Sequence, residues 1–173
     1  RNPDAIDETI SSELRLGALE DFRDYSPDLI AEVAHPAITQ TWGTQFLGFC
    51  DYMAGSPTAF ATLETEMAMR EAAALSNGHG LYIPRGALPG LDEVLRMVAN
   101  KKLGAAKISM KKHPSSLKYH GALATPLDEV TSETVVYDGP LRELCTLAPN
   151  NVNTMAVLAM ASELGFDTVQ AQL

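Results

Sequence analysis

The stretch LIAEVAHPAITQTWGTQFLGFCDYMAGSP, residues 29–57, decides the fold class. It begins with residues 29–34, a short and almost entirely apolar run that is typical of a strand buried on both faces of a parallel sheet. Pro36 suits the first position of a helix, and large apolar residues then recur at nearly helical spacing up to residue 49. Residues 51–57 resemble a second short strand that ends in a Gly-Ser-Pro turn. The stretch therefore predicts a strand–helix–strand unit.

The same alternation continues to about residue 100 and then stops. A helix over 62–78 that closes at Gly78, a strand over 80–86 and a helix over 91–100 extend the pattern, which predicts a parallel α/β sheet. After residue 104 we expect longer, partly alternating strands at 105–112 and 133–139, helices at 140–148 and 153–165, and a final strand at 167–173. The second half therefore predicts an α+β domain with a mixed, open sheet. The boundary falls near residues 85 to 90.

Composition excludes several classes of protein. The chain has 173 residues, 46% of them hydrophobic and 20% charged, which fits a core-forming chain of one domain or slightly more. A net charge of −9 argues against a nucleic acid or an anionic membrane as the main partner. The sequence shows no signal peptide, so we expect a reducing, cytoplasmic compartment. Cys50 and Cys145 lie in apolar segments, which favours core packing over catalysis.

Three loops follow the predicted parallel strands, where ligands bind in open α/β sheets. They are AHP (34–36), GSPTA (55–59) and PRGALPG (84–90), and the first two place His35 and Ser56 at a candidate cofactor site. Short turns that need Gly and Pro explain the same loops without a ligand. The sequence contains no Gly-x-Gly-x-x-Gly or Walker A loop, and no His/Cys cluster with metal-ligand spacing.

Three asparagines precede an apolar helical run in LAPNNVNTMAVLAMA, residues 147–161. A helix N-cap and a turn account for two of them. A further amide at a helix N-terminus could instead bind a ligand, because free N–H groups gather there. Both interpretations stay open on the local pattern.

Three segments, in order and with matching spacing, resemble the aspartate dehydrogenase family, including its animal members. They are YIPRGALPGLDEV (82–94), ISMKKHP (108–114) and VYDGPLRELCTLAPNNVNTMAVLAMASELGFD (136–167). The resemblance implies that residues 1–88 are the C-terminal part of a Rossmann NAD(P)-binding domain without its first strands. It also implies that residues 89–173 belong to a truncated catalytic and dimerisation domain of a homodimer.

The resemblance further implies an activity and its cofactor. The family oxidises the CH–NH2 group of L-aspartate with NADP or NAD, which gives iminoaspartate and hence oxaloacetate and ammonia. By that pattern the Gly-rich phosphate loop would precede Arg1 and the catalytic histidine would follow Leu173, so we expect the chain by itself to be too short for activity. Two other functions stay open: a non-catalytic, regulatory NAD(P)-binding protein, and a reductase similar to homoserine dehydrogenase.

Individual residues can be carried over from the family pattern. Asn153 matches a cofactor-contacting asparagine and Ala87 a cofactor-contacting alanine, whereas Asn151 is expected to be structural. Arg1 follows the expected second Rossmann strand and could pair with the 2′-phosphate of NADP, which favours NADP over NAD. Lys112 aligns with a basic pair and could hold a substrate carboxylate. Solvated side chains are the alternative for Arg1 and Lys112.

Overall fold

The first of two small sheets in the computed structural model, which describes residues 7–75 and 78–173, is entirely parallel. It contains β1 (Leu29–Glu32), β2 (Asp51–Ala54) and β3 (Leu81–Tyr82) in that spatial order. β1 pairs with β2 and β2 with β3, both in parallel. The predicted parallel α/β sheet is therefore confirmed.

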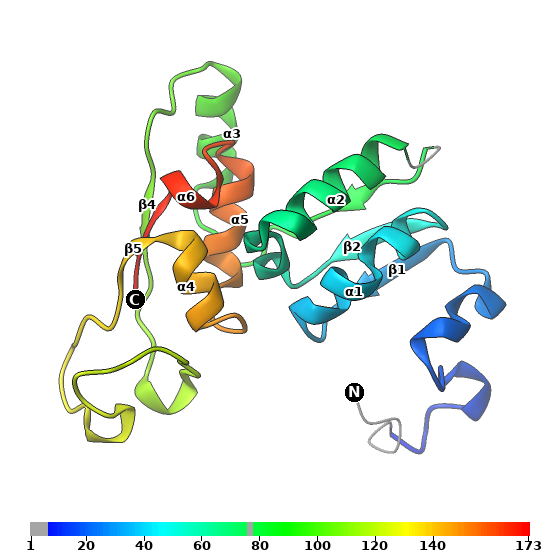
Figure 1. Ribbon diagram of the computed structural model, residues 1–173, viewed down its shortest axis with the longest axis horizontal. Helices are drawn as coiled ribbons and strands as arrows, with labels where there is room; N and C mark the ends of the chain where they lie inside the picture. The colour runs from blue at the N-terminus through cyan, green and yellow to red at the C-terminus, as the bar shows by residue number, and fades with distance from the viewer. Residues whose placement is uncertain (1–6, 76–77) are drawn as a thin grey trace.

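Two helices make the crossovers of this sheet. α1 (Pro36–Leu47) joins β1 to β2, α2 (Leu63–Leu75) joins β2 to β3, and the two helices contact each other beside the sheet (Figure 1). Pro36 is the first residue of α1, as expected, since its missing N–H is not needed there. Of the large apolar residues at helical spacing, Phe46 is almost completely buried against Tyr52 of β2, whereas Ile38, Trp42 and Phe49 are half-buried against the core.

The second sheet is mixed, as predicted. It contains β4 (Lys107–Ser109), β5 (Asp138–Pro140) and β6 (Gln170–Gln172), with β6 in the middle. β4 runs parallel to β6 and β5 runs antiparallel to it. The strands have three residues each, so the longer strands expected at 105–112 and 133–139 are wrong. Residues 133–135 are all exposed, so neither face of this segment is buried and their alternation supports no ladder.

The helices of the second half pack on one another and on this sheet. They are α3 (Leu91–Ala99), α4 (Leu141–Leu147), α5 (Asn153–Ala161) and α6 (Gly165–Thr168). The single helix expected at 153–165 is divided, because Glu163 and Gly165 adopt φ values of 57° and 77°, in the left-handed region. The chain therefore turns before α6, and the last strand starts at Gln170. The described chain also contains short 3-10 segments outside these helices: η2 (Ser12–Leu14), η3 (Leu19–Tyr25), η5 (Pro114–Ser116) and η6 (Leu127–Glu129).

A buried 3-10 turn, η4 (Pro57–Ala61), connects the two halves. All five of its residues are buried, and it contacts α1 and α2 on one side and α4 and α5 on the other (Figure 1). One hydrophobic cluster runs through it from Phe46 to Val169. The domain division between residues 88 and 89 stays a prediction, because this turn belongs to the core of both halves.

Arg142 of α4 fastens the end of η4. Its guanidinium donates to both carboxylate oxygens of Asp167 at 2.7 Å and also donates to the carbonyl oxygen of Ala61. The fork of the guanidinium suits such a bidentate pair. The contact holds α4 against the turn. No helix in the described parts of the chain is both long and apolar enough to cross a membrane.

Replacing Phe60 by alanine should lower the free energy of unfolding by about 3–5 kcal/mol, because its side chain is only 1% exposed and its removal leaves a cavity in η4. Denaturant unfolding followed by circular dichroism measures the change. Leu63→Ala is the matched control, since Leu63 is 53% exposed and should change stability by less than about 0.5 kcal/mol. Equal effects of the two substitutions would contradict a central role for η4.

Candidate functional site

A cavity of about 350 Å³ lies at the carboxyl ends of β1 and β2, and we call it the strand-end pocket. Residues 33–35 and 55–56, which follow these two strands, form one wall. Asn150, Asn151 and Asn153, at the start of α5, form another wall, and Ser116 and Lys118 complete it. The pocket therefore lies where the two halves meet, at the edge of the sheet where the sequence predicts a ligand.

Glu32, at the end of β1, holds together the two loops that form the first wall of the strand-end pocket. Its side chain is only 3% exposed. Oε1 accepts hydrogen bonds from the backbone N–H of Ala34 at 2.6 Å and of His35 at 2.7 Å. The Ser56 hydroxyl donates to Oε1 at 3.2 Å, and the Ser56 N–H donates to Oε2 at 2.9 Å. Glu32 was not among the site residues predicted from the sequence, although it is a single acidic residue in an apolar strand and could have been noticed for that reason.

The two strand ends approach each other closely at Gly55. Its N–H donates to the carbonyl oxygen of Glu32 at 2.7 Å. A Cβ atom on Gly55 would lie 2.3 Å from that oxygen, a distance that atoms of a folded chain do not adopt. Glycine is therefore required here for the loops to meet.

His35 caps α1 with its side chain. Nδ1 accepts a hydrogen bond from the Ala37 N–H at 3.2 Å, so the neutral ring carries its proton on Nε2. The ring is exposed and lines the strand-end pocket. In this tautomer His35 can offer an N–H donor to a ligand in the pocket.

Asn153 is the first residue of α5 and does not cap the helix. The N-cap position belongs to Val152, whose side chain has no acceptor, so the N-cap expected from one of the three asparagines is wrong. The Thr58 hydroxyl shares its proton between the carbonyl oxygen of Pro149 at 2.8 Å and Oδ1 of Asn153 at 3.1 Å. With Oδ1 engaged in this way, the Nδ2 group is the part of the amide left for a ligand.

Asn151 supports the opposite wall. Its Oδ1 accepts from the N–H of Lys118 at 2.9 Å, and its Nδ2 donates to the carbonyl oxygen of Ser116 at 3.1 Å. This arrangement agrees with the structural role expected for Asn151.

Lys118 brings a positive charge to the strand-end pocket. Its side chain is exposed, and within residues 7–75 and 78–173 it forms no ion pair. No described Asp or Glu residue lines the pocket itself. The wall therefore offers amides, a hydroxyl, an imidazole donor and one cation, which suits an anionic ligand with several acceptors. The loop around Lys118 carries no pattern that sequence analysis could use.

The remaining predicted residues lie elsewhere. Ala87 is exposed in the turn at 84–90 and is not part of the pocket wall. The turn lies near the start of α5, since a Cβ on Gly86 would be 3.9 Å from the Thr154 hydroxyl. Arg1 lies outside the described residues. The structure therefore brings His35, Ser56 and Asn153 together.

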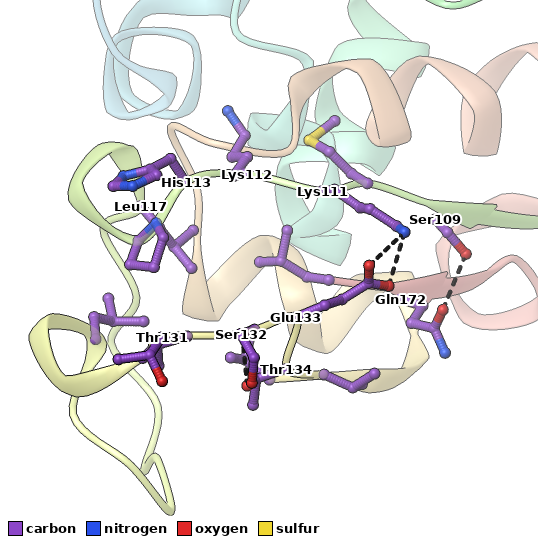
Figure 2. Close-up of a pocket in the computed structure, with 17 residues that line it drawn as sticks. Ser109, Lys111, Lys112, His113, Leu117, Thr131, Ser132, Glu133, Thr134 and Gln172 are labelled. Carbon is purple, nitrogen blue, oxygen red and sulfur yellow. Dashed lines mark hydrogen bonds and ion pairs between the residues drawn. The ribbon is translucent and has the colours of Figure 1, made fainter.

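Lys112 lies on a second cavity, of about 410 Å³, between residues 109–114 and 130–136 (Figure 2). Figure 2 shows its side chain directed away from Lys111, whose ammonium pairs with Glu133 at 2.7 Å. Lys112, the residue predicted to bind a substrate carboxylate, is thus separate from the strand-end pocket. Across the described residues, no group of three His, Cys, Asp or Glu side chains could hold a metal ion.

Both cysteines should be unreactive in the native protein. Cys50 and Cys145 are free and buried, in agreement with core packing. Burial raises the pKa of the Cys145 thiol to about 12 and also raises the pKa of Cys50, so both stay protonated at pH 8. Reaction with 5,5′-dithiobis(2-nitrobenzoate) should be slow in buffer and should reach two thiols in denaturant. Rapid reaction in buffer would show that these side chains are accessible.

Comparison with known proteins relates the chain to one family. A family model described as "Aspartate dehydrogenase, C-terminal" matches residues 93–173. An aspartate dehydrogenase domain-containing protein of Xenopus tropicalis is 46% identical over 171 residues, which are 98% of this chain and 60% of that protein. An L-aspartate dehydrogenase of Nitrosopumilus maritimus is 43% identical over 83 residues, 46% of this chain and 30% of that protein.

The fold also has a solved counterpart. The crystal structure of aspartate dehydrogenase from Thermotoga maritima matches with a TM-score of 0.74 and 23% identity over 98% of this chain and 66% of that one. At this identity the match supports the fold. The chain spans about 60% of the length of the Xenopus relative.

Proposed function

Since the chain belongs to the aspartate dehydrogenase family, we propose that the protein is an NAD(P)-dependent oxidoreductase that acts on the CH–NH2 group of L-aspartate. Removal of a hydride and a proton gives iminoaspartate, and addition of water then releases ammonia and oxaloacetate. The observation that carries the proposal is the strand-end pocket, which gathers His35, Ser56 and Asn153 at the carboxyl ends of parallel strands. The homodimer and the cytoplasmic location stay predictions.

The polar groups of the strand-end pocket fit the nicotinamide end of a dinucleotide. When bound, the nicotinamide supplies the hydride acceptor. The Nδ2 group of Asn153 can donate to a carboxamide oxygen or a ribose hydroxyl, and Nε2 of His35 offers a second donor. Two fixed donors would orient the ring and so determine which face meets the substrate. We keep NADP as the favoured cofactor, with Arg1 as the residue for its 2′-phosphate.

The substrate requires a cation, because L-aspartate carries two carboxylates. Lys118 lines the strand-end pocket, and Asn151 fixes its backbone. We therefore propose that Lys118 holds one substrate carboxylate, and we retain Lys112 as the alternative.

Asn153→Ala should weaken binding of NADPH and NADH at least about tenfold, because a ligand hydrogen bond in a partly buried site is lost. The free energy of unfolding should change by less than about 1 kcal/mol, because the side chain does not cap α5. Fluorescence titration and thermal unfolding of the full-length protein measure the two effects.

Asn151→Ala is the matched control for Asn153→Ala. It loses two hydrogen bonds that join loops, so it should lower stability by about 1–2 kcal/mol and affect binding less. If Asn153→Ala binds both cofactors with wild-type affinity, Asn153 has no part in cofactor binding.

Lys118→Gln should raise the KM for L-aspartate about tenfold with a smaller change in kcat, since a charge-assisted contact to the substrate is removed. Lys112→Gln is the matched lysine substitution. An increase in KM with Lys112→Gln alone would place the substrate carboxylate at Lys112. Turnover of L-homoserine in preference to L-aspartate would favour the other reductase class, and cofactor binding without turnover of either would favour a regulatory protein.

A further inference from the structure

Glu32 is the one charged residue that is buried in the described chain. A buried charge normally needs an oppositely charged partner, because its desolvation is costly. Within the described residues Glu32 forms no ion pair, and its contacts are three backbone N–H groups and the Ser56 hydroxyl. The carboxylate group is therefore held by N–H and O–H dipoles alone.

This charge lies directly behind the wall of the strand-end pocket. The residues that donate to Glu32 are Ala34, His35 and Ser56, and each of them lines the pocket. Backbone N–H groups can only donate, so the site is arranged for a carboxylate and not for a carboxylic acid. A group inside the pocket is thus separated from this buried carboxylate only by the residues that donate to it, on the side of the pocket opposite Lys118 and the start of α5.

Such a charge distinguishes the two redox states of a nicotinamide. The oxidised ring carries one positive charge and the reduced ring carries none, whereas the phosphates are the same in both states. We propose that Glu32 sets the redox preference of the strand-end pocket by favouring the oxidised, cationic ring. This inference rests on the proposed function, since it requires the nicotinamide to bind in this pocket.

Glu32→Gln in the full-length protein tests the charge. The substitution keeps the size of the side chain and removes its charge, so it should weaken the binding of NADP+ more than that of NADPH. The ratio of the NADPH to the NADP+ dissociation constant should fall roughly tenfold. Fluorescence and calorimetric titrations measure the two constants, and thermal unfolding reports whether the variant is folded.

Glu32→Asp is the matched control, because it keeps the charge and shortens the side chain by one methylene. Both forms of the cofactor should then bind more weakly, with their ratio unchanged within about twofold. Equal weakening of both forms by Glu32→Gln would show that Glu32 only holds the loops, and would overturn the inference.

If Glu32→Gln does not fold, the inference is tested by comparing the binding of NADP+ and NADPH to the wild-type protein. NADP+ should then bind to it at least as tightly as NADPH, and tighter binding of NADPH would overturn the inference. If the wild-type protein binds neither dinucleotide, the proposed function itself is wrong. The two proposals can therefore fail separately.

Discussion

The packing of η4 between helices of both halves is the constraint on which the site depends. The turn follows Ser56, so its position determines where the end of β2 presents that residue to the strand-end pocket. The hydroxyl of Thr58, within the turn, bonds to Pro149 and Asn153 at the start of α5. Arg142 holds the far end of the turn through the carbonyl of Ala61. One buried segment of five residues thus sets the distance between the opposite walls of the pocket.

Polar groups in the site are arranged in two layers. Behind the wall, Glu32 and Thr58 are buried, and their side chains form hydrogen bonds with other groups of the protein. At the wall, His35 and Asn153 have one side-chain group bound to the protein and another available to a ligand. Such support is what holds a binding group in a defined orientation, because a side chain with all its groups free would sample several rotamers.

The parts of the structure that follow from local patterns could be predicted from the sequence. The apolar run before His35 and the Gly-Ser-Pro turn at Ser56 place these residues at strand ends, and the structure agrees. Asn153 was predicted as a cofactor contact only through the resemblance to the aspartate dehydrogenase family. The local pattern of the three asparagines suggested a helix cap, which Val152 occupies instead. The role of Thr58 could not be recognised, because its partners Pro149 and Asn153 lie 91 and 95 residues away in the chain. The contact of Glu32 with Ser56, 24 residues away, could not be predicted for the same reason. The length of the strands in the second sheet was overestimated for a related reason. Alternation at 133–135 does not reveal whether either face of the segment is covered by another part of the chain.

The position of η4 also has a consequence for synthesis of the chain on the ribosome. Domains generally fold from the N-terminus as they emerge, each around its own core. Here the turn that follows β2 finds partners far along the chain: Ala61 binds Arg142, 81 residues later, and Thr58 binds Asn153, 95 residues later. In a nascent chain that has just exposed β1, β2 and β3, α1 and α2 can cover one side of η4, but its other side stays uncovered until α4 and α5 have left the exit tunnel. During that interval the chain presents the kind of surface that holding chaperones bind.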